Sequence, residues 1–385
     1  MTVKRLADIN CYDGKTINPL RFPDETYELY SVPSFDVGYP EIIRGSDIGS
    51  SKLVVEENDV LICKINPRIN RVWVVKHNTK FPLLASSEWI VVRNRDIDSN
   101  YLKWYFSSPA FRNLLVSQVA GIGGSLTRAQ PKQVGIYPIP IVSLNEQLKI
   151  ADTLEIVTEL ISLRIKQLTK LDELVKARFI EMFGDPVKNE KNWPMARLSD
   201  IAMIRIGPFG SLLHREDYIE NGHALVNPSH VIDGAIVADK TLTVSEDKYR
   251  ELSAYKLEIG DVVLGRRGEM GRCAVVYNDG FICGTGSLII RSGNTIKPYF
   301  LQKILSYPTF KSVIEEKSVG VTMQNLNVPI VSSLLIPSLP LELQEQYLKF
   351  VKQVDKLKFE IQKNLDILET FRKALMKQYF TEVKI

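Results

Sequence analysis

Residues 139–183 read IPIVSLNEQLKIADTLEIVTELISLRIKQLTKLDELVKARFIEMF, and this stretch decides how the rest of the chain is organised. Beyond Gln147 it runs for more than thirty residues without a glycine or a proline. Its apolar residues recur at steps of three and four, which is the spacing of one face of a long helix and close to that of a coiled-coil seam. A helix of roughly 36 residues is about 54 Å long, so it is too long to be buried in one ordinary domain.

A second copy of this pattern occupies residues 336–380, which read IPSLPLELQEQYLKFVKQVDKLKFEIQKNLDILETFRKALMKQYF. With a shift of 197 positions (344 − 147), Gln147 pairs with Gln344 and Phe183 pairs with Phe380. Both copies have the same order: a strand-like run, a proline turn, an acidic residue near a glutamine, and a long amphipathic helix. Heptad leucines alone could match by chance, but the matching proline-to-glutamine spacing indicates a true repeat.

The segments that precede the two helices also match. Residues 5–9 (RLADI) resemble residues 197–201 (RLSDI), and residues 59–61 (DVL) resemble residues 261–263 (DVV). A period near 200 is far too long for a solenoid repeat, so it indicates a duplicated unit of one globular domain and one long helix. The predicted segments are two globular domains at 1–143 and 184–340, and two long helices at 144–183 and 341–385.

The predicted fold class is α+β, with two tandem mixed α/β domains separated by two long antiparallel coiled-coil-like helices in an internal pseudo-twofold repeat. Antiparallel pairing of the helices would bury both apolar seams at once, which neither helix can do alone. The residues expected in this helix-pair seam are Leu154, Val157, Ile161, Leu168, Leu171, Val351, Val354, Leu357, Leu365 and Leu368.

The composition is that of an ordinary globular protein, with 385 residues, 45% hydrophobic and 24% charged. The net charge of +4 permits a nucleic-acid partner without demanding one. No apolar stretch is long enough to predict a membrane span, and the start of the chain lacks an apolar signal core. Four cysteines without a CxxC spacing predict reduced thiols rather than a disulfide or zinc framework. Together these features favour a cytoplasmic protein.

Motifs for catalysis are missing from the sequence. It contains no Walker-type GxxxxGK[ST], no GxGxxG after a strand, no HExxH and no [DNS]PP[YF] motif of amino-methyltransferases. Its four histidines are scattered, without an acidic or cysteine partner at a recognisable metal-ligand spacing. In both halves of a duplicated chain, this pattern favours a binding or scaffolding role with no catalytic residue, metal or cofactor of its own.

Several strings in the second half resemble a known family. They are IGPFGSLLHREDYIENGHALVNPSHVIDG at 206–234, GDVVLGRRGEMGRCAVV at 260–276, MFGDP at 182–186, and the IP…LNEQ and IP…LELQEQ entries to the two long helices. In this order around an internal duplication, they resemble the specificity subunit of Type I restriction-modification systems.

The resemblance implies that each globular unit is a target recognition domain that reads one half of a bipartite, asymmetric double-stranded DNA sequence. It further implies that the helices form an antiparallel spacer on which two methyltransferase subunits dock, with restriction subunits joining the complex. S-adenosylmethionine, and ATP and Mg²⁺ for restriction, would then reside in the partner subunits. Two readers on one DNA face stand about 34 Å apart or slightly more, which a helix pair of the predicted length can span.

Candidate DNA contacts come from loops rich in arginine, glycine and small polar residues. Tight glycine turns around Arg266 can bring guanidinium and backbone N–H groups to a phosphate or a guanine edge, although a solvated hairpin has the same composition. The full set of candidates is Lys64, Arg68, Asn70, Arg71, Gly123, Ser125, Thr127, Arg128, Gly210, Ser211, Arg266, Arg267, Arg272, Thr322, Gln324 and Asn325. The alternative interpretation of the chain is a non-enzymatic scaffold with two ligand-binding domains on a coiled-coil strut.

Overall fold

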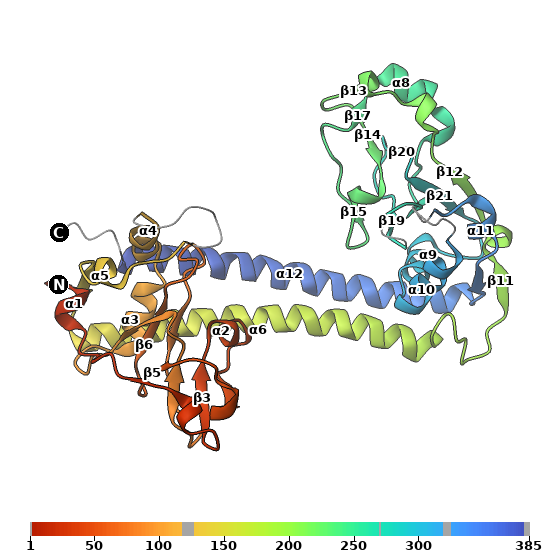
Figure 1. Cartoon of the computed structure of the whole chain (residues 1–385). Helices are drawn as coiled ribbons and strands as arrows, with labels where there is room; N and C mark the ends of the chain where they lie inside the picture. Colours follow the sequence, from red (N-terminus) through yellow and green to blue (C-terminus); the bar gives the residue numbers. More distant parts are fainter. Residues whose placement is uncertain (1, 118–126, 269–270, 319–324, 381–385) are drawn as a thin grey trace. The chain divides into compact units, whose positions relative to one another are not determined.

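The computed structural model describes residues 2–117, 127–268, 271–318 and 325–380. The chain divides into two compact units (Figure 1): unit 1 comprises Met1–Gln167 and Ile361–Ile385, and unit 2 comprises Leu168–Glu360. The two long helices, α6 (Leu144–Phe183) and α12 (Leu341–Tyr379), each contribute to both units. Each unit therefore contains one globular domain together with part of both long helices.

The globular domain of unit 1 is built on two sheets and a pair of strands. β1 (Thr2–Arg5) and β10 (Pro138–Ile141) form an antiparallel pair beside the start of α6. A three-stranded antiparallel sheet has the order β7 (Val72–Val74), β6 (Val60–Cys63) and β9 (Trp89–Val92). A five-stranded mixed sheet has the order β2 (Thr16–Ile17), β5 (Lys52–Val54), β8 (Leu83–Ala85), β3 (Thr26–Tyr30) and β4 (Glu41–Arg44).

Short helices connect and cover these strands in unit 1. They are α1 (Leu6–Ile9), α2 (Val32–Val37), α3 (Ser99–Phe106), α4 (Pro109–Ser117) and α5 (Pro131–Val134). α3 carries the apolar face that packs against β6 and β7, because Tyr101, Tyr105 and Phe106 on it are buried. The β-branched and apolar residues of β6 are all buried, as expected for a central strand covered on both faces.

Unit 2 repeats this plan with longer connections. β11 (Met195–Arg197) pairs with β22 (Leu335–Pro337) beside the start of α12. A four-stranded antiparallel sheet has the order β12 (Ala202–Ile206), β21 (Ser287–Ser292), β18 (Val262–Gly265) and β19 (Cys273–Val275). A four-stranded mixed sheet, in which β14 and β20 are parallel, has the order β13 (Tyr218–Ile219), β17 (Thr243–Val244), β14 (His223–Val226) and β20 (Ile282–Cys283). β15 (Val231–Ile232) pairs with β16 (Ala235–Ile236).

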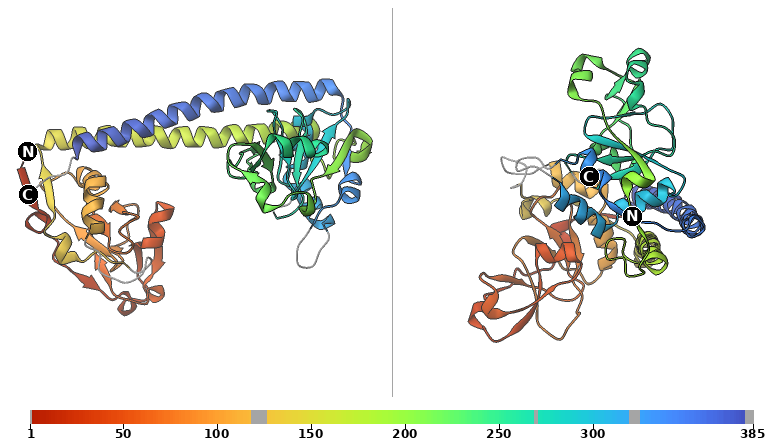
Figure 2. Two further views of the ribbon diagram at one scale, coloured as in Figure 1. Left: turned by 90° about the horizontal axis from the view of Figure 1, so that it is seen from above. Right: turned by 90° about the vertical axis from the view of Figure 1, so that its right-hand side faces the viewer.

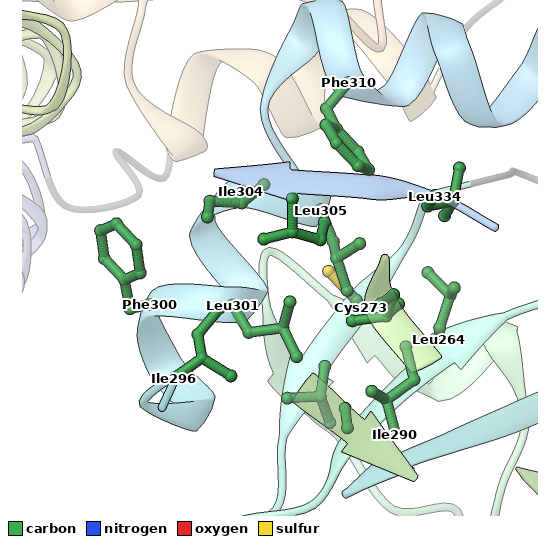
Figure 3. Packing of buried hydrophobic residues seen from close by; sticks show 14 of the residues in the cluster. Leu264, Cys273, Ile290, Ile296, Phe300, Leu301, Ile304, Leu305, Phe310 and Leu334 are labelled. Atoms are coloured by element: carbon green, nitrogen blue, oxygen red, sulfur yellow. The ribbon is translucent and has the colours of Figure 1, made fainter. Parts of the chain in front are cut away.

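The helices of the unit 2 domain are α7 (Leu198–Ile201), α8 (Glu246–Glu251), α9 (Pro298–Leu305), α10 (Pro308–Lys317) and α11 (Val328–Ser332). A large cluster of buried side chains includes residues of α9 and of the β12-β21-β18-β19 sheet. Figure 3 shows Leu301 and Leu305 of α9 packed toward Leu264 and Ile290 of the sheet. Each fully buried side chain of this size stabilises the fold by roughly 1.5–3 kcal/mol, so this contact anchors the domain.

Aromatic side chains attach the end of one long helix to the domain that carries the start of the other. In unit 2, Phe183 at the end of α6 contacts Phe300 of α9, with ring centroids 4.9 Å apart, and Tyr347 in α12 at 5.5 Å. In unit 1, Phe380, just after α12, lies 5.7 Å from the rings of both Tyr101 and Tyr105 of α3. The end of α6 and the beginning of α12 lie side by side in both views of unit 2 (Figure 2).

A buried glutamine ties the first turn of each long helix to its own domain. Gln147 is 2% exposed, and its carboxamide oxygen accepts a hydrogen bond from the Asp98 backbone N–H at 2.9 Å. Its Nε2 donates to the Val142 carbonyl, also at 2.9 Å. Because Asp98 is the N-cap of α3, this one side chain links the start of α6 to the start of α3.

Gln344 repeats these bonds in unit 2 and adds one. Its oxygen accepts from the Lys297 N–H at 2.9 Å, and Lys297 is the N-cap of α9. Its Nε2 donates to the carbonyls of Leu339 at 2.9 Å and Thr295 at 3.1 Å. A buried amide must have its hydrogen bonds satisfied, so the glutamine fixes the direction in which each helix leaves its domain.

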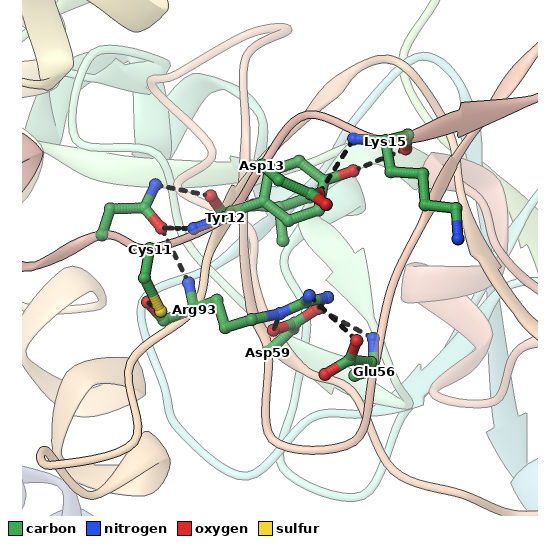
Figure 4. A network of polar contacts seen from close by, with 9 residues as sticks. Cys11, Tyr12, Asp13, Lys15, Glu56, Asp59 and Arg93 are labelled. Carbon is green, nitrogen blue, oxygen red and sulfur yellow. Dashed lines mark hydrogen bonds and ion pairs between the residues drawn. The ribbon is translucent and has the colours of Figure 1, made fainter.

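A second pair of matched interactions lies at the base of the central strands. Asp59 is 1% exposed and forms a bidentate ion pair with Arg93, with distances of 2.8 and 2.7 Å, while Glu56 completes the cluster (Figure 4). In unit 2, Asp261 is equally buried and pairs with Arg291 at 2.7 and 2.9 Å. The repeat in the sequence therefore corresponds to the same bonds in three dimensions.

The helix seam follows the predicted spacing with one error. Leu154, Val157, Ile161, Val351, Val354 and Leu365 are buried, and Leu168, Leu171 and Leu368 are half-buried. Leu357 was expected in the seam but is 55% exposed. Four residues after the buried Val354, on the same face of α12, lies the half-buried Lys358, whose ammonium pairs with Asp172 of α6 at 2.5 Å. Leu357 lies about 100° around the helix from that position and points away from the seam.

No described helix is both long enough and apolar enough to cross a membrane.

The buried glutamine gives a test of how the helices are anchored. Gln344→Ala leaves the Lys297 N–H and two carbonyls without their partner, so we expect the free energy of unfolding of unit 2 to fall by about 2 kcal/mol. Gln346→Ala is the matched control, because Gln346 is exposed in the same turn of α12. Urea unfolding followed by circular dichroism measures both, and equal midpoints for the two variants would contradict the anchoring role.

Candidate nucleic-acid interface

The β18–β19 hairpin of unit 2 holds a glycine-rich loop. The hairpin closes through the Gly265 N–H, which donates to the Arg272 carbonyl at 2.8 Å. Gly268 and Gly271 have φ of +79° and +75°, the left-handed region that favours glycine. A Cβ on Gly271 would also lie 2.7 Å from Cγ of Lys311 in α10. These glycines are therefore required by the tight turn and by its contact with α10.

Arg266 lies at the base of this loop and is only 7% exposed. Its Nε donates to Oδ1 of Asn325 at 3.0 Å, and its carbonyl accepts from the Leu326 N–H at 3.0 Å. Among the described residues no carboxylate pairs with it, and burial, together with the charge of Arg267, lowers the pKa of the Arg266 guanidinium. A buried cation without a counter-ion is costly, so the site favours an anionic or strongly polar ligand.

Unit 1 places the corresponding segments by the same backbone bonds. The Cys63 N–H donates to the Arg71 carbonyl at 3.0 Å, as Gly265 does to Arg272. The Ala129 N–H donates to the Lys64 carbonyl at 2.9 Å, as Leu326 does to Arg266. In both units, therefore, a backbone hydrogen bond joins the loop after the central strand (β6 in unit 1, β18 in unit 2) to the segment that leads toward the next long helix.

The turn in unit 1 uses asparagines where unit 2 uses glycines. Asn66 and Asn70 have φ of +50° and +52°, a conformation that asparagine tolerates better than most residues. The Asn70 N–H donates to the Pro67 carbonyl at 3.1 Å, and its side-chain Nδ2 donates to the Phe106 carbonyl at 2.9 Å. The same backbone plan thus presents two chemically different loops.

Comparison with known proteins identifies what these paired domains are. Residues 190–377 match the family model of the Type I restriction modification DNA specificity domain. The Type I restriction enzyme MjaVIII specificity subunit of Methanocaldococcus jannaschii is 22% identical over 353 residues, which cover 87% of this chain and 81% of that protein. Residues 190–377 belong to the family of Type I restriction-modification DNA specificity domains. The chain has a DNA sequence-specificity role, as the resemblance in its sequence implied.

Solved structures share the fold of this specificity subunit. A chain from a structural study of complex assembly and conformational transition in a type I R-M system has a TM-score of 0.65 at 19% identity, and the match covers 99% of this chain and 98% of that one. The S subunit of a Type-I restriction-modification system from M. genitalium has a TM-score of 0.59 at 15% identity, covering 100% and 96%. The predicted α+β fold class is confirmed.

The structure brings only some of the candidate contacts of the specificity subunit together. In the second target recognition domain, Arg266 and Asn325 meet directly, and Arg267 beside them is exposed. Arg272 Nη1 lies 3.5 Å from the Pro228 carbonyl. Ser211 is exposed in a short 3-10 turn with Gly210, and no hydrogen bond among the described residues joins it to the Arg266 loop.

The GPFG stretch before that turn has a structural explanation. A Cβ on Gly207 would lie 2.1 Å from the Gly284 carbonyl oxygen, so the close approach of two backbones requires the glycine.

In the first target recognition domain, two of the candidate arginines are already ion-paired. Arg71 forms a bidentate pair with Asp36 at 3.1 Å, and Arg128 pairs with Glu88 at 3.1 Å. Thr127 is buried, and Lys64 is half-buried at the base of the loop. The remaining candidates, Gly123, Ser125, Thr322 and Gln324, lie outside the described residues. The DNA contacts therefore stay a prediction.

Sequence reasoning missed two basic residues that the structure places at the loops. Arg112 of α4 lies beside Arg68, and Lys311 of α10 covers Gly271. Each is the fourth residue of a helix that begins with proline, at Pro109 and Pro308. In the sequence, Pro109 and Pro308 lie at matching places of the repeat, each three residues before its basic residue, so aligning the two halves there would have found both.

Among the described residues no cluster of histidine, cysteine, aspartate and glutamate could hold a metal ion.

The contact between Arg266 and Asn325 can be tested by substitution. Asn325→Ala removes the acceptor of a buried guanidinium, and hydrogen bonds to charged groups stabilise proteins by roughly 1.5–3 kcal/mol, so we expect the free energy of unfolding to fall by about 2 kcal/mol. Asn278→Ala, at an exposed position in unit 2, is the control. Denaturant titration gives the comparison, and an Asn325→Ala midpoint no lower than that of Asn278→Ala would show that the contact does not hold Arg266.

Proposed function

We propose that this specificity subunit reads a bipartite, asymmetric double-stranded DNA sequence, with one half-site for each target recognition domain. The observation that carries the proposal is that both units place equivalent loops by the same backbone bonds while the side chains on those loops differ. Equivalent placement gives two readers of one design, and different side chains give two different half-sites. A homodimer, in contrast, reads a palindrome because its two loops are identical.

The side chains at the loops are of the kinds that read base edges. Arginine binds guanine O6 and N7 in a bidentate manner, and asparagine binds adenine N6 and N7. Arg266 and Asn325 together bring both kinds of donor to one place in unit 2. Phosphate contacts by exposed basic residues would supply much of the affinity, so binding weakens as salt rises.

The proposed partners are two methyltransferase subunits, with restriction subunits joining the assembly. Supporting this, the long helices carry apolar residues outside the buried seam. On α6 in unit 1, Ile156, Leu160 and Leu163 are 58%, 38% and 47% exposed at steps of four and three. On α12 in unit 1, Ile367 and Phe371 are 57% and 49% exposed, four residues apart. An amphipathic helix of a partner fits such a stripe.

S-adenosylmethionine would be bound by the methyltransferase subunits, and ATP and Mg²⁺ by the restriction subunits. The chain itself would contribute sequence recognition and the positioning of these partners on DNA.

Direct binding tests this proposal. The purified chain should select one bipartite motif from a library of random duplexes, and its affinity should fall steeply between 50 and 200 mM salt, by roughly 10³–10⁵ if six to ten phosphates are contacted. It should transfer no methyl group to that DNA when S-adenosylmethionine is added without a partner subunit. Selection of no motif would favour a scaffold with other ligands, and methyl transfer by the chain alone would contradict the non-catalytic assignment.

The long helices should set the gap between the half-sites. Deleting seven residues, about two turns, from the middle of both α6 and α12 removes about 10 Å of helix, so the unread gap should shorten by about 3 base pairs. The motif selected from random duplexes measures the gap directly. The control replaces seven exposed residues of the same helices by alanine without changing their length. A motif with the original gap, bound by the shortened chain, would refute the spacer role.

A further inference from the structure

We propose that a cleft in unit 1, between the Asn66–Asn70 turn and α4, binds a phosphate group of the DNA backbone. This inference rests on the proposed function. It adds residues at and in α4 to the loop residues that the proposed function names. The cleft has a volume of about 370 Å³ and is lined by Arg68, Ser107, Pro109, Arg112, Asn113 and Val116.

The lining of this cleft is positively charged, and no carboxylate is among its described residues. It offers two guanidinium groups and one carboxamide, all of which can donate hydrogen bonds. Among the described residues neither Arg68 nor Arg112 has an ion-pair partner. Arginines nearby in the same unit do: Arg71 pairs with Asp36 and Arg128 with Glu88. Two unpaired guanidiniums that face one cleft favour an anion with several acceptor oxygens, and guanidinium binds phosphate in a bidentate manner.

The backbone that carries Arg68 is held in place by the turn around it. The Ile69 N–H donates to the Asn66 carbonyl at 2.9 Å, and Asn66 and Asn70 hold left-handed conformations on either side. The side chain of Asn70 then bonds to the Phe106 carbonyl at the end of α3. The turn is thus fastened to the segment that leads directly into α4, so Arg68 does not depend on the ligand for its position.

The backbone that carries Arg112 is fixed by a buried serine. Ser108 is 0% exposed, and its Oγ accepts from the Phe111 N–H at 3.2 Å while its carbonyl accepts from the Arg112 N–H at 2.9 Å. Phe111 is itself fully buried against Tyr105, with ring centroids 5.5 Å apart. Both arginines therefore project from rigid backbone, which lowers the entropic cost of binding a ligand between them.

The second unit supports a phosphate rather than a base as the ligand. Its α10 carries Lys311 at the position equivalent to Arg112, and this lysine lies against the Gly271 loop. An exchange of arginine for lysine keeps a positive charge but loses the bidentate fork that reads a guanine edge. A side chain that is basic in both units, but of a different type in each, is suited to bind the DNA backbone. The backbone phosphates are the same at both half-sites, whereas the bases differ.

Arg112→Ala in the full-length chain tests the site, with binding measured by fluorescence anisotropy over a range of KCl concentrations. One duplex carries the selected motif and the other a scrambled sequence. We expect both affinities to fall by a similar factor and the slope of log K against log [KCl] to become shallower by about 0.9, the value for one phosphate. Arg68→Ala should behave alike, and Arg112→Lys should keep most of the wild-type affinity and slope.

The control is Arg95→Ala, because Arg95 is exposed before the other end of α3 and does not line the cleft. It should leave affinity and slope unchanged. Replacing KCl by sodium phosphate at equal ionic strength should weaken DNA binding by the wild-type chain more than by Arg112→Ala, because free phosphate competes with the duplex for the cleft. An equal effect on the two proteins would overturn the assignment.

Three other results would also overturn the assignment. A changed base preference in the motif selected by Arg112→Ala would make the cleft a base reader. If Arg112→Ala and Arg68→Ala both bind with the wild-type affinity and slope, the cleft does not contact DNA. That result would not affect the proposed function. A wild-type chain that binds neither duplex would refute the proposed function and this site with it.

Discussion

The buried carboxamide at the start of each long helix is the constraint on which the rest of the structure depends. Gln147 and Gln344 each bond to the backbone N–H that caps the first helix packed on the domain sheet. Each of them does so from the first turn of a helix of 39 or 40 residues. Because a buried amide must keep its hydrogen bonds, this side chain fixes the start of each long helix on the domain that precedes it.

Duplication gives this constraint its functional value. Each unit repeats the buried glutamine and the aspartate–arginine pair, while the loops beyond the central strands have diverged. Under the proposed function, the shared support would let loops with different side chains read different half-sites. Phe183, at the end of α6, packs on the domain of unit 2, which precedes α12. Phe380, just after α12, packs on the domain of unit 1, which precedes α6. Each half of the chain therefore helps to stabilise the unit of the other half.

Local patterns accounted for much of this organisation. The helices, the duplication and the family were visible in residues 139–183 and their copy, because a 3.6-residue period and a proline-to-glutamine spacing are local features. The error at Leu357 has a physical cause: an alignment of leucines does not fix the helical register, and Lys358 takes the seam position by pairing with Asp172. Leu160, its partner in the alignment, is also 38% exposed.

The sequence by itself determined the repeat, the helix lengths and the kinds of residue available on each loop. Only the tertiary structure decided which of those residues are free to bind. Arg71 and Arg128 look as suitable as Arg68 in the sequence, yet both are occupied by acids at Asp36 and Glu88. Ion pairing and burial depend on neighbours that lie 35 and 40 positions away in the chain, and folding alone brings these charges together.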